Sequence, residues 1–358
     1  MLGPGKCQYW QPETLMNFET SMHALYMGTR MAWDKDQKPN DIIDELHTLF
    51  YGNASREMAA YWHFVDKVWA DTPEYAGGGF GHMRRWTQAR TDQARKLMEL
   101  ARKKCKTKAE SARAEMASLS LQQFEAFMQV RRDLSDGRWE TLADDSETYR
   151  KRVLELGTRY LPQSAFGKMG WCKNKTINGY YFDVFYKNTY EDAARIAASF
   201  QVLTTPPLRA WRYAQDKEKK GEAAGWARPD YDDQAWKVTD PCVDTWSTLG
   251  YHNYMGSLWY RTRLELQTVP AGKKVFLWIG ATDGRMKVFV NGKHVAYVDA
   301  KDRTVDSFSS HCRPVSFDVT KYVKSAGDNQ ISLLCTRESI NELGTGGLIG
   351  PVALYCEK

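Results

Sequence analysis

Three pairs of neighbouring acidic residues are the first candidates for chemistry in this sequence. They are Asp44 with Glu45, Asp144 with Asp145, and Asp232 with Asp233. Two carboxylates can hydrolyse a glycosidic bond when they flank it, about 5 Å apart in a retaining site and about 6.5 to 9.5 Å apart in an inverting one. Side chains of adjacent residues point in different directions. We therefore interpret the first pair as helix surface, the second as a solvated first helical turn, and the third as part of a turn.

Other motifs that would carry catalysis or bind a metal are missing from the sequence. Residues 77–81 read Gly-Gly-Gly-Phe-Gly, but no Gly-Lys-Ser/Thr follows them, so a loop is predicted there and not a phosphate cradle. The seven histidines never form H-x-x-x-H or H-E-x-x-H, and no Gly-x-Ser-x-Gly occurs. The seven cysteines are scattered singly, without the spacing of a zinc site, which indicates mostly reduced, buried thiols. We expect no zinc protease, no serine hydrolase and no cofactor.

Length and composition indicate a globular protein of two domains. The chain has 358 residues, against about 100 to 200 residues for an ordinary domain. Charged residues make up 26% and hydrophobic residues 42%, as in typical globular proteins. The aromatic share of 13% is unusual. Aromatic rings stack on the apolar faces of sugars and also fill cores, so this excess fits a carbohydrate role without requiring one.

The charge pattern does not favour a nucleic-acid or membrane partner. The formal net charge of +6 is modest, and basic residues are dispersed among acidic ones. The densest basic cluster, residues 102–108, follows the end of a predicted helix, where it complements the helix dipole. No stretch approaches the about 18 consecutive apolar residues of a membrane span, and residues 1–5 do not resemble a signal peptide. We expect no nucleic acid and no membrane span.

The first half of the sequence has the apolar periodicity of successive helices. Asn40 is placed to cap a helix whose apolar positions 42, 43, 46, 49 and 50 share one face, and Gly52 is placed to end it. Further helices are predicted at residues 53–69, 87–104, 108–135 and 140–160.

The second half has the short runs of a β-sandwich. Asn291-Gly292 predicts a hairpin between residues 286–290 and 293–298, because both central positions of a type I′ turn have positive φ. Residues 275–279 are apolar on both faces, which indicates a central strand. Trp259 and Tyr260 are neighbours on a predicted strand, so alternation puts one ring in the core and the other at the surface.

These patterns predict an α+β multidomain protein with three regions. Residues 1–169 are predicted to form a helical domain. Residues 170–207 are interpreted as a connector with a strand at 180–186 and a short helix at 191–198. Residues 208–358 are predicted to form the sandwich, since short β-rich runs separated by turn residues are typical of that architecture.

Several pieces of the second half occur in a recognisable order. They are Trp211-Arg212-Tyr213 with Asp216 and Gly221 to Trp226, then Asp232-Asp233-x-x-Trp236, then residues 256–261 (Gly-Ser-Leu-Trp-Tyr-Arg), then 290–293 (Val-Asn-Gly-Lys) with 317–320 (Phe-Asp-Val-Thr), and the final turn at 344–352. Together they resemble the galactose-binding-like, jelly-roll sugar-binding domain of β-galactosidase and β-glucuronidase-type glycoside hydrolases. The resemblance implies that most of these residues serve packing and turns.

The helical half carries a second resemblance. Its residues are 26–34 (Tyr-Met-Gly-Thr-Arg-Met-Ala-Trp-Asp), 50–54 (Phe-Tyr-Gly-Asn-Ala), Met58 and Tyr61-Trp62. They resemble the C-terminal part of an uncharacterised bacterial glycoside-hydrolase-like family that is similar to α-glucuronidases and β-hexosaminidases. The resemblance implies that Trp33 and Asp34 end the last strand of a TIM barrel, where the indole stacks on a sugar and the carboxylate accepts hydroxyl hydrogen bonds. The alternative is that Trp33 packs against the following helix and Asp34 caps it.

The second resemblance also implies a barrel that this sequence does not contain. A TIM barrel needs about 200 or more residues and all eight strands. In the related hydrolases the catalytic carboxylates lie on strands that would precede Met1. We therefore interpret the helical segment as the remnant C-terminal part of a TIM-barrel protein, and expect no catalytic residue in it. Related proteins act outside the cytoplasm, so the resemblance implies an extracellular or periplasmic location for the full-length protein, whereas the sequence itself does not specify a compartment.

Loops at one end of the predicted sandwich are expected to hold the ligand-binding groups, because polar side chains beside an aromatic ring can grip sugar hydroxyls. The candidates are Trp246, His252, Asn253 and Tyr254, then Asp283 and Arg285, and finally Arg337, Glu338 and Asn341. Some sandwiches of this type hold a structural calcium through loop oxygens, but no acidic loop here has a readable ligand spacing.

The leading functional hypothesis is a non-catalytic carbohydrate-binding or substrate-orienting region of a glycoside-hydrolase-like protein, with an oligo- or polysaccharide as its partner. One alternative is an active glycoside hydrolase that completes its site with a separately encoded barrel through Trp33 and Asp34. The other is a purely structural spacer.

Overall fold

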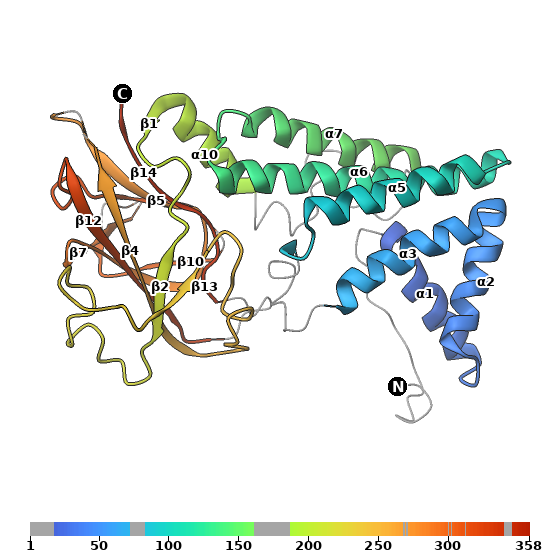
Figure 1. Ribbon diagram of the computed structural model, residues 1–358, viewed down its shortest axis with the longest axis horizontal. Helices are drawn as coiled ribbons and strands as arrows, with labels where there is room; N and C mark the ends of the chain where they lie inside the picture. Colours follow the sequence, from blue (N-terminus) through green and yellow to red (C-terminus); the bar gives the residue numbers. More distant parts are fainter. Residues whose placement is uncertain are drawn as a thin grey trace. The chain divides into compact units, whose positions relative to one another are not determined.

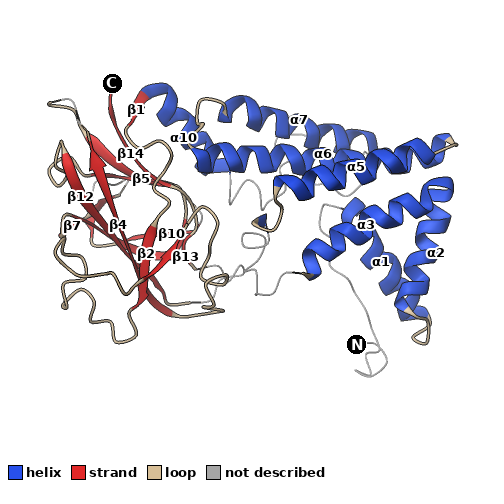
Figure 2. Ribbon diagram, in the orientation of Figure 1, coloured by secondary structure: helices blue, strands red, loops and turns tan. Residues whose placement is uncertain are grey.

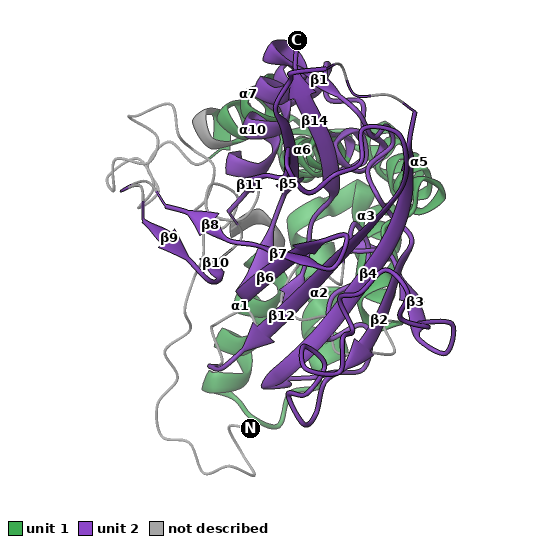
Figure 3. Ribbon diagram, turned by 90° about the vertical axis from the view of Figure 1, so that its left-hand side faces the viewer, with its two compact units in different colours: residues 1–71, 86–128, 147–179 green, residues 72–85, 129–146, 180–358 purple. Residues whose placement is uncertain are grey.

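The computed structural model describes residues 18–71, 83–160, 187–267, 269, 271–299, 301, 303–311, 313–339 and 346–358. The chain divides into two compact units (Figure 3). The first, here called the helical unit, comprises residues 1–71, 86–128 and 147–179, and the second, the β unit, comprises residues 72–85, 129–146 and 180–358. Figure 2 shows helices followed by strands, as the sequence predicts. The predicted strand at 180–186 lies outside the described residues.

The helical unit is built from amphipathic helices around one apolar core. Its elements are α1 (Phe18–Trp33), α2 (Pro39–Tyr51), the 3-10 turn η1 (Gly52–Ala54), α3 (Ser55–Ala70), α5 (Gln88–Lys104), and parts of α6 (Lys108–Asp136) and α7 (Leu142–Tyr160). Tyr51, Met58, Tyr61, Met98 and Leu121 are buried together in the core. The helical segment predicted from apolar periodicity is therefore confirmed.

The start of α2 differs from the prediction. Asn40 does not cap this helix, because Pro39 is its first residue and Lys38 takes the N-cap position without a side-chain hydrogen bond. Proline suits the first helical position, since its fixed φ matches the helix and its missing N–H has no helical partner there. Gly52 ends the helix at a φ of 52°, as predicted.

Histidines from three helices of this unit lie together. His23 of α1 and His47 of α2 have their Nε2 atoms 3.1 Å apart. The ring of His63 in α3 lies 5.9 Å from the ring of His47. Burial, followed by the neighbouring charges of His47 and His63, lowers the pKa of His23 to about 4. Burial also lowers the pKa of His47.

We expect the helical unit to lose stability as the pH falls from about 6.5 to about 4. In this window unfolded His23 binds a proton and folded His23 resists it, so protons favour the unfolded state. The difference corresponds to at most about 3 kcal/mol in the free energy of unfolding, with no further loss below the folded pKa. Urea denaturation followed by far-UV circular dichroism at several pH values measures it.

His23→Gln is the informative variant, because glutamine can still hydrogen-bond but does not titrate. It should flatten the acid dependence of the helical unit. If the free energy of unfolding depends on pH in the same way in wild type and in His23→Gln, the acid dependence does not come from His23.

The β unit contains two antiparallel sheets (Figure 1). In the four-stranded sheet the order is β1 (Phe200–Val202), β14 (Val352–Glu357), β5 (Val275–Ile279) and β11 (Val315–Asp318). The larger sheet runs β10 (Phe308–His311), β6 (Thr282–Val290), β12 (Gly327–Arg337), β4 (Gly256–Leu266), β2 (Trp211–Gln215) and β3 (Lys237–Thr239), and β7 (Lys293–Val295) and β13 (Gly347–Leu348) also pair with β6. A small third ladder joins β8 (Tyr297–Val298) to β9 (Thr304–Val305).

One apolar core holds the two large sheets together. It includes Leu258 and Leu333 from the larger sheet and Leu277 and Leu354 from the smaller. Two antiparallel sheets that share such a core form a β-sandwich, as predicted. The Asn291-Gly292 turn has φ values of 52° and 79°, which confirms the predicted hairpin.

Helical residues cover the outer face of the four-stranded sheet. Trp278 on β5 donates its Nε1–H to Asp192 of α10 (Asn188–Ser199) over 2.9 Å. The ring of Trp139, in the turn between α6 and α7, lies 4.9 Å from the Trp278 ring. These contacts explain why residues 129–146 group with the sandwich.

The expectation that one ring of the Trp259-Tyr260 pair lies at the surface is wrong. Both residues are buried, at 0% and 2% exposure. Tyr260 packs in the core, and Trp259, on the other face of β4, packs with Trp226 and Trp236 from the loop at 216–236. The prediction failed because this loop folds back over the outer face of the larger sheet, which local alternation does not reveal.

Two general expectations concern the whole chain. Within the described ranges, no helix is long and apolar enough to cross a membrane. Cys105, Cys242, Cys335 and Cys356 are free thiols, and all but Cys105 are buried. The remaining cysteines, Cys7, Cys172 and Cys312, lie outside the described residues.

Candidate functional site

Strand register brings several predicted site residues to one end of the sandwich. Gly256, the first residue of β4, pairs with Arg337, the last residue of β12. The Cα of Arg337 lies 3.6 Å from the position that a Cβ on Gly284 would take, so β6 begins beside them. We call this end the rim and define it as residues 246–256, 282–285, 337–339 and 346–348.

A buried aromatic pair supports the rim. Trp246 is fully buried and donates its Nε1–H to the Tyr260 hydroxyl over 2.6 Å. Burial raises the pKa of Tyr260 well above its usual value, so its hydroxyl stays neutral. Because the indole is enclosed, Trp246 positions the rim and offers no surface for stacking. Tyr260 was not among the site residues predicted from the sequence, although its place beside Trp259 on a predicted strand was the available signal.

The chain ahead of β13 closes over Trp246. Asp283 is 3% exposed, and its Oδ2 accepts the backbone N–H of Gly346 over 2.7 Å. Asp283 also pairs with Gly347 in the β6–β13 ladder. A Cβ on Gly347 would overlap Nε1 of Trp246. Asp283 therefore holds a glycine turn flat against the indole.

Exposed polar groups lie around this support. His252 and Asn253 are exposed, and Asn253 has a positive φ of 49° in the turn before β4. Tyr254 is half-buried, and its hydroxyl accepts the backbone N–H of Ser257 over 3.3 Å. Arg285 and Glu338 form an exposed ion pair. A ligand at the rim can contact these side chains.

Arg337 is the unusual member of the rim. Its residue is 2% exposed, and its Nε donates to the Ser339 carbonyl over 3.1 Å. Both Nη atoms are buried, and among the described residues neither has a hydrogen-bond partner. Asn341, also predicted as a site residue, lies outside the described residues.

Trp33 and Asp34 belong to the helical unit and share no described site with the rim. Trp33, at the end of α1, is 92% exposed and does not pack against the following helix. The carboxylate of Asp34 accepts the Asp36 N–H over 3.1 Å and the Gln37 side-chain amide over 3.3 Å. Asp34 therefore closes the turn between α1 and α2.

The acidic pairs have structural partners. Glu45 accepts hydrogen bonds from Tyr26 and Arg30, which lower its pKa. Asp145 is not the solvated residue that was predicted, because it is half-buried and hydrogen-bonded to Asp133. Burial and the Asp133 carboxylate raise the pKa of Asp145.

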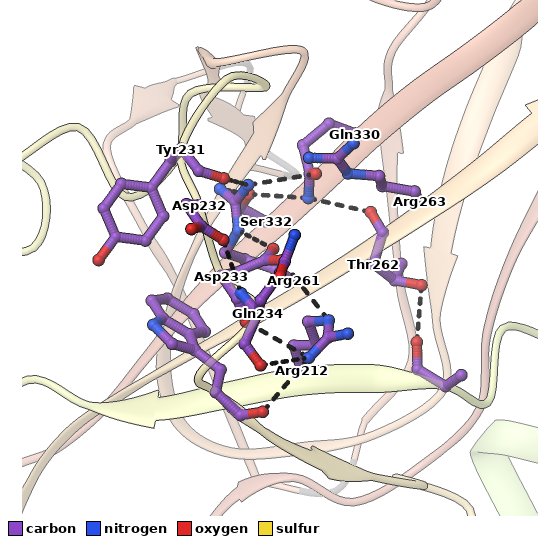
Figure 4. Close-up of polar contacts among 12 residues, drawn as sticks. Arg212, Tyr231, Asp232, Asp233, Gln234, Arg261, Thr262, Arg263, Gln330 and Ser332 are labelled. Atoms are coloured by element: carbon purple, nitrogen blue, oxygen red, sulfur yellow. Dashed lines mark hydrogen bonds and ion pairs between the residues drawn. The ribbon is translucent and has the colours of Figure 1, made fainter.

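Asp233, of the third acidic pair, binds the most buried arginine of the sandwich. Arg261 of β4 is 0% exposed, and its Nε donates to Asp233 Oδ2 over 2.6 Å (Figure 4). Its Nη2 donates to Gln330 Oε1 over 3.3 Å. Other partners are the carbonyls of Trp226, Arg228 and Tyr231. Arg261 thus pins the loop at 216–236 to the sheet, so its role is structural. The signal in the sequence was an arginine directly after the apolar run of residues 258–260.

No group of three or more histidine, cysteine, aspartate or glutamate side chains in the described part of the chain could hold a metal ion.

The β unit is similar to parts of known glycoside hydrolases. Residues 221–340 match the family model of the β-galactosidase second all-beta domain. No curated protein matches the sequence. A β-glucuronidase of Bacteroides uniformis matches with 21% identity and a TM-score of 0.33, over 44% of this chain and 18% of that one. A glycoside hydrolase family 2 β-glucuronidase matches with 17% identity and a TM-score of 0.34, over 44% of this chain and 17% of that one.

A Ruminococcus gnavus β-glucuronidase matches with 19% identity and a TM-score of 0.33, over 42% of this chain and 28% of that one. The matched region is thus less than a third of each of these enzymes. The family-model match shows that residues 221–340 resemble the second all-beta domain of β-galactosidases, and this likeness agrees with the two-sheet architecture. The resemblance of the helical half to α-glucuronidases and β-hexosaminidases stays a prediction.

Proposed function

We propose that the β unit is a carbohydrate-binding, substrate-orienting region of a glycoside-hydrolase-like protein, and that the rim contacts the sugar. The observation that carries the proposal is that the rim segments hold His252, Asn253, Tyr254 and the Arg285–Glu338 pair, and that the Trp246–Tyr260 pair supports these segments. Polar groups beside an aromatic ring can bind sugar hydroxyls, and a rigid underlying layer reduces the entropy lost on binding.

A second candidate function rests on the helical unit. The indole of Trp33 is 92% exposed, so it is available to stack on a sugar ring beside Asp34. A separately encoded barrel would then supply the catalytic carboxylates. Release of nitrophenol from aryl glycosides by this chain together with such a barrel, abolished by Asp34→Asn, would favour the enzyme.

Weakened glycan binding is expected when His252→Ala is combined with Asn253→Gly. Glycine retains the positive φ of position 253, so the double variant removes an imidazole and an amide without straining the turn. Each lost hydrogen bond contributes about 1 kcal/mol, so affinity should fall by about tenfold or more. Titration calorimetry against galactosides, glucuronides and N-acetylglucosamine oligomers measures it.

Lys219→Gly is the matched control, because Lys219 is exposed and also has a positive φ, 57°, but lies outside the rim. If the double variant and this control bind glycans with equal affinity, the binding site does not include His252 and Asn253. If the wild type binds none of these glycans, the alternative of a structural spacer is favoured.

A further inference from the structure

Arg337 carries hydrogen-bond donors that the described fold leaves unused. Each Nη atom bears two N–H groups, and both atoms are buried without a partner among the described residues. Buried Nη groups without an acceptor are costly, because the desolvation of a charged group is then only partly compensated. The arrangement therefore indicates an acceptor that approaches from outside this part of the chain.

The two neighbouring acids have other partners among the described residues. Residue 337 lies on the same face of β12 as Cys335 and Leu333, which are in the sandwich core. Glu338 is on the opposite face and pairs with Arg285. The carboxylate of Asp283 binds the Gly346 N–H.

Thr282 is a second polar residue with an unused group at this end. It lies on the same face of β6 as Met286 and Val288, so it faces the interior as Arg337 does. Thr282 is 2% exposed, and its Oγ1 has no hydrogen-bond partner in the described part of the chain. A hydroxyl and a guanidinium with unused groups at the same end of neighbouring strands together suit an oxyanion.

We propose that Arg337 and Thr282 bind the anionic group, a carboxylate or a sulfate, of an acidic saccharide at the rim. The inference rests on the proposed carbohydrate-binding function and narrows its ligand class. The guanidinium donates two parallel hydrogen bonds to the oxyanion and the threonine hydroxyl donates a third. Because both Nη atoms are covered, the anion reaches them only when rim side chains move, so association is slow for a small ligand.

Matched pairs of ligands test the charge preference on the full chain. Calorimetry compares methyl glucuronide with methyl glucoside, and galactose 6-sulfate with galactose. Wild type should bind the acidic member of at least one pair about tenfold or more tightly, which corresponds to one charged hydrogen bond. Arg337→Met should lose this preference and keep the binding of the neutral member. Thr282→Val should lose part of it.

Arg263→Met is the control, because Arg263 lies on the same sheet, is exposed and already donates to the Pro229 carbonyl over 3.0 Å. It should retain the full preference. Arg337→Lys keeps the charge but loses the planar fork, so it should bind the acidic sugar less tightly than wild type does.

Stability without ligand is a second readout. The Nη atoms of Arg337 have no acceptor among the described residues, so replacing the guanidinium by methionine should leave the thermal midpoint unchanged or raise it. A large drop, or failure of Arg337→Met to fold, would reveal an internal partner and overturn the inference.

Three further outcomes bear on this inference and on the proposed function. Equal binding of the acidic and neutral members of both pairs would overturn the inference and leave carbohydrate binding intact. Binding of none of the sugars would overturn both. If inorganic sulfate binds the chain but no acidic sugar does, the assignment of the ligand to a saccharide is also overturned.

Discussion

Asp233→Ala is expected to lower the free energy of unfolding of the β unit by about 3 to 5 kcal/mol, because it leaves the buried guanidinium of Arg261 without its carboxylate. Arg261 is 0% exposed, so water cannot replace the lost acceptor. The loop at 216–236 should also loosen, since Arg261 binds the Trp226, Arg228 and Tyr231 carbonyls. Urea denaturation followed by tryptophan fluorescence measures the loss.

Asp230→Ala is the matched control on the same loop. Asp230 pairs with Arg228 at the exposed surface, so its removal should change the midpoint too little to resolve. The double variant Asp233→Leu with Arg261→Met should recover much of the lost stability, because it replaces the buried ion pair by apolar groups. Similar losses in Asp233→Ala and Asp230→Ala would show that the ion pair does not hold the loop.

Local patterns were sufficient to predict most of the helices and the clearest hairpin. The 108–135 helix was predicted from apolar spacing, and the structure has it at Lys108–Asp136. Asn291 and Gly292 specified their turn because few residues adopt positive φ. Such features depend on neighbours in the chain, so they can be read without knowing the fold.

Features that depend on distant contacts were missed. Trp259 is buried because a loop that precedes it by many residues folds back over the sheet and binds Arg261. Asp145 is paired because Asp133, on the preceding helix, lies within hydrogen-bond reach. The start of α2 was also missed, since proline at its first position outweighed the capping preference of Asn40.

The residues of the rim were predicted from the sequence as loop residues at one end of the sandwich. The sequence does not specify which of these residues are buried and which face the solvent. The register of Gly256 with Arg337 and of Asp283 with Gly347 determines which members are supports and which are exposed. Trp246 and Asp283 became supports, and His252 and Asn253 are at the surface.

Gly347→Ala should damage both the stability and the ligand binding of the rim. The positive φ of Gly347, 76°, costs an alanine about 1 to 2 kcal/mol. The new Cβ would overlap Nε1 of Trp246, so the indole has to move and lose its hydrogen bond to Tyr260. Together these effects should lower the free energy of unfolding by about 3 to 5 kcal/mol, and glycan affinity should fall because the support no longer holds the rim.

Gly272→Ala separates backbone strain from the steric effect of the same substitution. Gly272 has a φ of 77°, and a Cβ there would meet nothing within 4 Å. It should therefore cost only the strain of about 1 to 2 kcal/mol and leave glycan binding unchanged. The difference between the two variants, measured by urea denaturation, reports how firmly Trp246 is held. Equal losses would mean that the indole yields freely to the new methyl group, and that a rigid aromatic support is not what organises the rim.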